Sequence, residues 1–246
     1  MDIRKKSFSV MLLLCSFFYA AVAHGGQCAD SVKVYNAGVN GNTTANMLAR
    51  LDKDVLSKTP ELVVLMAGTN DMLHTDKSVS MEVYEKNYQE LITRLQKKCT
   101  VIMMTIPPIY APYLVQRKPQ FKGDLHAPQA RVDSANEAIR RLAAKNNCKL
   151  IDLNGILLAC GGANIDKEGL FQNEANIGIN DGIHPTANGY KVIATAVYQT
   201  IMDCKPGVKS VACFGDSITK GFRMQGEGKT EGDSYPAVLN RMLNRE

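Results

Sequence analysis

The sequence lacks the residue patterns that usually hold a metal ion or a nucleotide cofactor. It contains seven cysteines and four histidines, but they form no Cys-x-x-Cys pair and no Cys/His cluster, so we expect no metal site. It also has neither a Gly-x-Gly-x-x-Gly segment nor a P-loop, and we therefore expect no cofactor.

An excess of charge of one sign is missing as well. The formal net charge is +5 over 246 residues, and the basic side chains are scattered, which argues against a nucleic-acid partner. The hydrophobic fraction of 45% and the charged fraction of 22% are typical of a soluble globular protein. A chain of this length can bury one sizeable core, so a single α/β domain fits, and the oligomeric state stays open.

No apolar run reaches the roughly 20 residues that a membrane-spanning helix needs. The nearest candidate is the N-terminus, where the charged segment 2–6 precedes a mostly apolar stretch at 7–20 and the small-x-small sequence Ala21-Val22-Ala23. This pattern predicts a signal peptide over about residues 1–23, a mature domain over 24–246, and a secreted or periplasmic protein without stable membrane insertion. An uncleaved membrane anchor is the alternative.

The cysteines agree with export, since six of the seven remain after the signal peptide is removed. Cys99 and Cys148 each stand just ahead of an apolar strand-like run, so they could meet at one edge of a parallel sheet, and Cys28 and Cys204 are placed similarly. The sequence alone does not choose among the pairings, but Cys99–Cys148 and Cys28–Cys204 are the pairs we expect. Cys213 lies inside its strand, and we expect it to be a buried thiol.

Strand and helix patterns alternate along the mature chain. Strand-like runs cover residues 31–39, 62–67, 100–106, 149–153 and 210–214. Helical spacing covers residues 43–57, 80–98, 130–147, 186–203 and about 234–244, with an inward face of 80–98 formed by Val83, Tyr84, Tyr88, Leu91, Ile92 and Leu95. This alternation predicts a parallel sheet covered by helices on both faces.

Longer loops follow the carboxyl ends of several strands, at 110–126, 154–180 and 221–233. Ligand sites in open α/β sheets form at that edge. Ser217 lies there, because the apolar strand 210–214 leads directly into a Gly-Asp-Ser sequence. Serine is a weak nucleophile until a base takes its proton, so such a site needs a histidine and an acid from elsewhere. A turn without chemistry is the alternative for this tripeptide.

Three other stretches at the same edge could complete such a site. The segment 36–43, which contains Gly41, follows the first strand, and the Gly-x-Asn-Asp sequence that contains Asn70 follows the second. Asp181 and His184 stand three residues apart before the helix at 186–203, so one turn can present an acid and a base. Each stretch alone also has a structural interpretation, as a turn or a helix cap.

Together, the four stretches resemble the sequence blocks of the SGNH hydrolases, the GDSL-type lipase and esterase superfamily. The serine block corresponds to residues 215–219, the glycine block to 36–43, the Gly-x-Asn-Asp block to 68–71 and the Asp-x-x-His block to 181–184. The resemblance extends over nearly all of the mature chain. It implies a three-layer, flavodoxin-like α/β fold with a five-stranded parallel sheet and helices on both faces.

One departure from the family is large. In the family the serine block comes first, whereas here it follows the Asp-x-x-His block. We interpret this as a circular permutation, with the old ends joined near residues 205–207 and new ends opened after Asn244 and before Ser31. The resemblance then implies that the serine strand lies between the strands at 31–39 and 62–67. A truncated tandem of two domains is the alternative.

The resemblance also implies a role for each site residue. Ser217 attacks an ester carbonyl, His184 acts first as the base and then as the acid, and Asp181 orients the imidazole. The backbone N–H groups of Ser217 and Gly41 and the side-chain amide of Asn70 form the oxyanion hole. We expect Asp216 to cap its own turn and to take no part in the chemistry.

The sequence says less about the substrate. Polar, Gly-rich loops around the site favour a small acyl group on a polar carrier, so the first hypothesis is a deacetylase of glycans. A lysophospholipase or thioesterase acting on longer acyl chains is the rival within the same class. A catalytically silent glycan-binding domain is the rival from another class, although a binding module has no need of Ser217, His184 and Asp181 together.

Overall fold

The structure, a computed structural model, describes residues 31–244. The signal peptide predicted over residues 1–23 and Cys28 lie outside the described residues, so the predictions about them stay predictions. The strands are β1 (Lys33–Gly38), β2 (Leu62–Leu65), β3 (Thr100–Met104), β4 (Lys149–Ile151) and β5 (Ser210–Gly215). The α-helices are α1 (Thr44–Asp54), α2 (Thr69–Leu73), α3 (Met81–Gln96), α4 (Ala111–Arg117), α5 (Ala127–Lys145), α6 (Leu153–Ala159), α7 (Glu174–Ile177), α8 (Ala187–Cys204), α9 (Ser217–Lys220) and α10 (Tyr235–Asn244).

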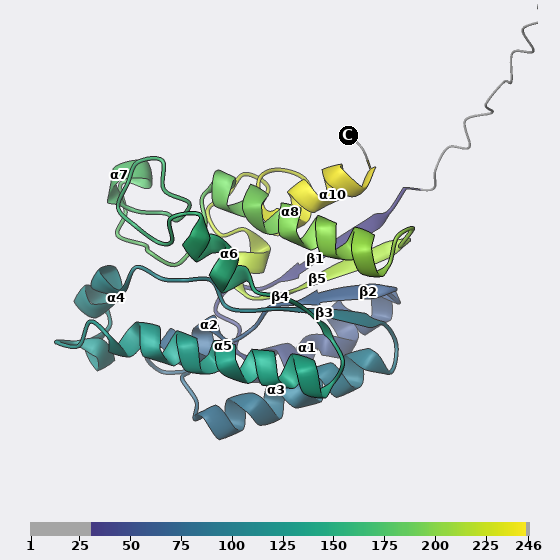
Figure 1. Cartoon of the computed structure of the whole chain (residues 1–246), viewed down its shortest axis with the longest axis horizontal. Helices are drawn as coiled ribbons and strands as arrows, with labels where there is room; N and C mark the ends of the chain where they lie inside the picture. The colour runs from purple at the N-terminus through teal and green to yellow at the C-terminus, as the bar shows by residue number, and fades with distance from the viewer. Residues whose placement is uncertain (1–30, 245–246) are drawn as a thin grey trace, which may run out of the picture. The chain divides into compact units, whose positions relative to one another are not determined.

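The five strands form one parallel sheet in the order β1-β5-β2-β3-β4 (Figure 1). This arrangement confirms the predicted α/β fold class. β5, the last strand along the chain, lies between β1 and β2, as the resemblance to the SGNH hydrolases implies. The segment that follows β5 is therefore held by neighbouring strands on both sides.

Each face of the sheet carries its own apolar core, because successive side chains of a strand point to opposite faces and these strands are apolar on both. Val63 and Leu65 of β2 pack with residues of α1, α3 and α5, whereas Leu62 and Val64 pack with residues of α6, α8 and α10 (Figure 1). Among the helices of residues 31–244, none combines the length and the apolar character that crossing a bilayer requires. The carboxyl ends of the strands are left for loops that can form a site.

The predicted strands and long helices agree with the structure to within a few residues, but two details are wrong. Val83 is 43% exposed instead of facing inward, because it lies beside the buried stripe that Tyr84, Tyr88 and Leu91 form on α3. The loops predicted at 110–126 and 154–180 contain the short helices α4, α6 and α7. Helices of four to seven residues are too short to show a repeating apolar period.

The predicted pairing of Cys99 with Cys148 is also wrong, since both are free thiols in the structure. The register of the two strands that they precede explains why. Ile102 lies opposite Lys149, so the neighbour across from Cys148 is Val101 and not Cys99. The two cysteines are therefore two residues out of step at the sheet edge.

The remaining cysteine predictions have different outcomes. Cys204 is a free thiol, and its predicted partner Cys28 lies outside the described residues. Cys213 is fully buried inside β5, as predicted, and burial raises the pKa of its thiol to about 12. A thiol of that kind packs as a small apolar group and is inert at neutral pH.

Candidate active site

Ser217 begins the short helix α9 directly after β5. The approach requires glycine at position 215, since a Cβ there would lie 2.1 Å from Oγ1 of Thr219 and 2.7 Å from the carbonyl oxygen of Met66. Asp216 caps the helix, with Oδ1 accepting a hydrogen bond of 2.9 Å from the N–H of Ile218. The tight turn thus fixes a largely buried serine at the carboxyl end of a central strand.

Asp181 and His184 lie in the turn ahead of α8. Oδ1 of Asp181 accepts hydrogen bonds from the backbone N–H groups of Ile183 at 2.9 Å and His184 at 2.8 Å, so the carboxylate orders the turn. Nδ1 of His184 lies 3.0 Å from each carboxylate oxygen of Asp181, and Nε2 lies 3.0 Å from Oγ of Ser217. The fold therefore brings three residues from two separate parts of the sequence into one hydrogen-bonded chain.

The surroundings of Asp181 keep its carboxyl group ionised. Burial by itself raises the pKa, but the hydrogen bond and charge attraction of the His184 ring, together with the N–H groups of His184 and Ile183, lower it to about 2. An ionised carboxylate at Nδ1 favours the tautomer that carries its proton there. Nε2 is then left to accept the proton of the Ser217 hydroxyl, which is the arrangement that activates a serine nucleophile.

The three predicted oxyanion-hole donors differ in their present partners. Among the described residues, the backbone N–H groups of Ser217 and Gly41 donate to no other group. The side-chain amide of Asn70 donates to the carbonyl oxygen of Asn42 at 3.0 Å and to Oδ2 of Asp216 at 3.2 Å. The amide therefore links the glycine block to the turn that carries the serine.

Asp216 is a buried carboxyl group beside that amide. Burial raises its pKa to about 6, and the charge of Asp71 adds to the rise. The N–H of Ile218, the charge of His184 and the Thr69 hydroxyl act in the opposite direction but do not cancel it. Asp216 and Asp181 thus lie near the same imidazole with pKa values displaced in opposite directions.

Asp71, the second acid of the Gly-x-Asn-Asp block, has a structural contact. Its carboxylate accepts hydrogen bonds from the Thr44 N–H at 3.0 and 3.1 Å and from the Thr44 hydroxyl at 2.5 Å. Asp71 therefore joins the second block to the first turn of α1. Within residues 31–244, no group of three or more His, Cys, Asp and Glu side chains is placed to hold a metal ion.

Arg50 of α1 holds two strand ends together, and the sequence gives no signal for it. Its guanidinium donates to the carbonyl oxygens of Ala37 at 3.0 Å and Gly215 at 2.8 Å. It also donates to Oδ1 of Asn42 at 2.5 Å. These contacts join β1, β5 and the glycine block, whereas an arginine on an amphipathic helix is expected to face solvent.

Phe222 and Arg223, in the loop after α9, are two more residues of the site without a sequence signal. The ring centroids of Phe222 and His184 lie 4.6 Å apart, and the Arg223 guanidinium lies 4.6 Å from the centroid of the Phe222 ring. Nη1 of Arg223 donates to Oδ2 of Asp181 at 3.0 Å. This loop therefore contacts both the imidazole and the carboxylate.

Two further side chains hold the segments around Asp181. Gln172 is fully buried, and its Nε2 donates to the carbonyl oxygens of Pro185 and Phe222, both at 3.0 Å. Arg117 of α4 donates to the backbone carbonyl oxygens of Asn180 and Asp181. All of these contacts join segments that are distant in the sequence, so no local pattern could indicate them.

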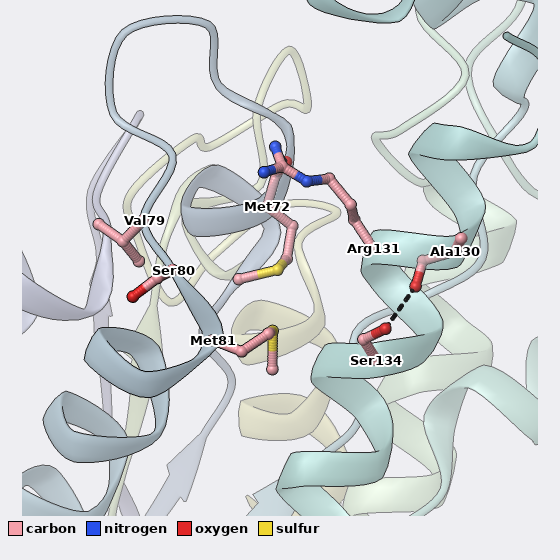
Figure 2. A pocket seen from close by; sticks show the side chains of 7 residues that line it. All are labelled: Met72, Val79, Ser80, Met81, Ala130, Arg131 and Ser134. Carbon is pink, nitrogen blue, oxygen red and sulfur yellow. Dashed lines mark hydrogen bonds between the residues drawn. The ribbon is translucent and has the colours of Figure 1, made fainter.

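A separate cavity of about 210 Å³ lies between α2, the start of α3 and α5 (Figure 2). It is lined by Met72, Val79, Ser80, Met81, Ala130, Arg131 and Ser134. Arg131 donates to the carbonyl oxygen of Met72 at 3.1 Å. None of Ser217, His184 and Asp181 lines this cavity, although Met72 belongs to the same short helix as Asn70.

The sequence is similar to known esterases over most of its length. The GDSL-like Lipase/Acylhydrolase family matches residues 15–192, a range that ends before Ser217. An acetylxylan esterase of Geobacillus stearothermophilus is 24% identical over 183 residues, which cover 69% of this chain and 72% of that protein. An arylesterase of Vibrio mimicus is 34% identical over 94 residues, which cover 37% of this chain and 44% of that protein.

Solved structures share the fold. The acetyl xylan esterase AlAXEase superimposes with a TM-score of 0.53 at 28% identity, covering 67% of this chain and 79% of that one. A lipase/acylhydrolase from Enterococcus faecalis gives a TM-score of 0.51 at 22% identity, covering 66% of this chain and 72% of that one. At 22% identity, the similarity to the Enterococcus faecalis structure supports the fold only.

Proposed function

Because the chain belongs to the GDSL-like lipase/acylhydrolase family, and is therefore a carboxylic ester hydrolase, we propose that Ser217, His184 and Asp181 are its catalytic triad. The observation that carries the proposal is the continuous chain of contacts, 3.0 Å from hydroxyl to imidazole and 3.0 Å from imidazole to carboxylate. Distances of this size allow proton transfer at the first link and orientation of the ring at the second.

The proposed reaction has two halves. Oγ of Ser217 attacks the ester carbonyl carbon while its proton passes to Nε2 of His184, and the bond to the alcohol then breaks as the imidazolium returns the proton to the alcohol oxygen. A water molecule then attacks the acyl carbon while its proton passes to Nε2 of His184. The bond between the acyl carbon and Oγ breaks, the imidazolium returns the proton to Oγ, and the carboxylic acid leaves with the Ser217 hydroxyl restored. Asp181 stays ionised throughout and stabilises the imidazolium.

The developing oxyanion needs donors that are already in place. The N–H groups of Ser217 and Gly41 suit this role because they donate to no other described group. The Asn70 amide is the third donor in the proposal. It would exchange its longer contact, that with Asp216, for the oxyanion, while the contact with Asn42 keeps the amide in position.

The proposed substrate is a short-chain ester, acetyl before others, on a carbohydrate. The likeness to an acetyl xylan esterase at 28% identity supports this choice, and so do the polar, Gly-rich residues of the loop 221–233. Export to the periplasm or the medium belongs to the same proposal, on the pattern of residues 1–23.

Circular permutation also remains a proposal. It is supported by the position of β5 between β1 and β2, and by the closeness of the two ends of the described chain. The Val32 N–H donates to Oδ1 of Asn244 at 2.8 Å, and Nδ2 of Asn244 donates to the Val32 carbonyl oxygen at 3.1 Å. Ends that lie side by side are those that a permutation can join or open.

The test of the triad is Ser217→Ala. We expect turnover of p-nitrophenyl acetate to fall by about 10³-fold or more with the thermal unfolding midpoint preserved. Ser57→Ala, which removes an exposed hydroxyl of η1 (Leu56–Lys58), is the matched control and should keep full activity.

A fluorophosphonate probe should label the wild type and the control but not Ser217→Ala. Labelling that persists without Ser217 would contradict the assignment, and a wild type that is never labelled would favour a silent binding domain.

The same assay decides the acyl group. Esters from C2 to C12 should give an optimum at C2, and acetylated xylan should release acetate. An optimum near C8 would instead favour the lysophospholipase or thioesterase hypothesis.

A further inference from the structure

The loop after α9 reaches back to the acid of the proposed triad. Nη1 of Arg223 donates to Oδ2 of Asp181 at 3.0 Å, whereas the backbone N–H groups of Ile183 and His184 use Oδ1. The carboxylate is therefore fixed from two sides, by its own turn and by an arginine 42 residues further along the chain. The Asp181 side chain is buried and that of Arg223 is 37% exposed, so the pair is only partly screened by solvent.

The backbone of Arg223 is held in an unfavourable conformation. Its φ of +63° lies in the left-handed region, which residues other than glycine rarely adopt. The Arg223 N–H donates to Oε2 of Glu227 at 3.1 Å, and Glu227 in turn pairs with Lys220 at 2.9 Å. Residues kept in such regions by their surroundings concentrate at functional sites, which points to a role for this one.

The neighbouring ring extends the contact from the acid to the base. Phe222 contacts both groups, since its centroid lies 4.6 Å from the Arg223 guanidinium and 4.6 Å from the centroid of the His184 ring. The buried Gln172 holds the carbonyl oxygen of Phe222 at 3.0 Å. The same loop thus limits how Asp181 and His184 can move.

We propose that Arg223 is a positioning residue, which fixes the Asp181 carboxylate directly and the plane of the His184 ring through Phe222. The inference rests on the proposed function of the triad. Arg223 shares the carboxylate with the imidazole and adds a positive charge near it. Loss of that charge should therefore change the pH dependence of the reaction as well as its rate.

Other titratable groups also act on Asp181 and His184, and a test of Arg223 has to take them into account. Asp181 also faces Arg117 from α4 and Tyr190 from α8, and His184 faces Asp216 at the start of α9. Of these groups, Arg117 also interacts electrostatically with Arg223. Arg223→Lys keeps the charge, so comparing it with Arg223→Asn separates the effect of the charge from that of the guanidinium contacts.

Two variants separate positioning from a merely structural role. Arg223→Asn removes the charge but tolerates the left-handed backbone, and Arg223→Lys keeps the charge. For the asparagine variant we expect kcat for p-nitrophenyl acetate to fall roughly 10- to 100-fold with little change in KM. The acidic limb of its kcat/KM profile should move to higher pH. The lysine variant should restore the position of that limb and part of kcat.

The matched control is Arg94→Asn, which removes an exposed ion pair with Asp52 at 2.7 Å. It should leave kcat and the pH profile unchanged. Wild-type kcat and an unmoved acidic limb in Arg223→Asn would overturn the inference. So would an equal loss in both variants accompanied by a lower unfolding temperature, since that indicates structure alone. Fluorophosphonate labelling of the wild type is measured alongside. If the wild type is labelled but the Arg223 variants have wild-type kcat and pH profiles, only this inference is contradicted. If the wild type is not labelled, the triad is contradicted as well.

Discussion

Two buried acids near one imidazole respond to their surroundings in opposite ways. Asp181 gains hydrogen bonds from His184 and Ile183 that outweigh burial, and its pKa falls to about 2. Asp216 has fewer donors and complete burial, and its pKa rises to about 6. The first acid is therefore suited to stay charged beside the base, and the second gives up part of its charge in mildly acidic solution.

This difference makes a prediction for the pH dependence of stability. The folded chain binds the Asp216 proton more tightly than the unfolded chain does, because its pKa is raised from 3.8 to about 6. The stability from this group is fully present below pH 3.8 and is lost as the pH rises through about 6. Asp181 has the opposite sign, and its contribution is lost as the pH falls from 3.8 toward 2.

Asp216→Asn removes the first effect and nearly preserves the side-chain shape. Urea unfolding at a series of pH values from 4 to 7 should show the wild type gaining stability relative to the variant as the pH falls, by at most about 3 kcal/mol. Parallel curves for the two proteins would show that Asp216 has an ordinary pKa in the folded chain.

Some residues of the site could be identified from the sequence and others could not. The two groups differ in how their contacts arise. Ser217, Asp181 and His184 lie in short blocks with a recognisable order of residue types, so they could be proposed before any coordinates. Arg50 and Arg223 act through contacts with residues far away in the sequence, such as Gly215 for Arg50 and Asp181 for Arg223. No neighbouring residue in the chain marks such a contact, and only the assembled fold shows it.

At the scale of elements, periodicity decides what can be predicted. The buried strands and the helices of ten or more residues repeat their apolar positions often enough to be located. The four-residue helix α7 depends instead on a cap, in which the Asn173 side chain accepts from the N–H groups of Ala175 and Asn176. One polar residue ahead of an irregular segment is too weak a pattern to identify a helix.

The contact between α1 and the strand ends can be tested through Arg50. Arg50→Met keeps the length of the side chain but removes the donors to the carbonyl oxygens of Ala37 and Gly215. Loss of donors to partly buried carbonyl groups should lower the free energy of unfolding by about 1–3 kcal/mol. Arg50→Lys should recover only part, since an ammonium group lacks the planar fork of the guanidinium.

The control for this change is Arg94→Met, where an exposed ion pair is removed and less than about 1 kcal/mol should be lost. Both variants are compared with the wild type by urea unfolding. An Arg50 variant as stable as its Arg94 counterpart would mean that the strand ends are held by other contacts.

For the whole molecule, the decisive feature is that β5 occupies the middle of the sheet although it comes last in the chain. It pairs with β1 on one side and β2 on the other, and its apolar residues belong to the cores of both faces. Two independent domains in tandem would not share one sheet in this way. The serine block can therefore come last in the chain and still take its central place in the sheet. A circular permutation requires this.

The central position of β5 predicts what should happen when the ends of the chain are moved. A chain that opens within residues 205–207, and that joins Asn244 to Val32 through a short Gly/Ser linker, would place the serine block first. The hydrogen bonds between Val32 and Asn244 show that the linker has almost no distance to cover. We expect this chain to fold with a thermal unfolding midpoint within several degrees of the original and to retain turnover of p-nitrophenyl acetate.

A chain that stops at residue 208 instead loses a central strand and both of its neighbouring contacts, so it should show no cooperative unfolding transition. If the shortened chain folded cooperatively by calorimetry, residues 31–208 would be a domain in their own right, and the permutation would be the wrong description of this protein.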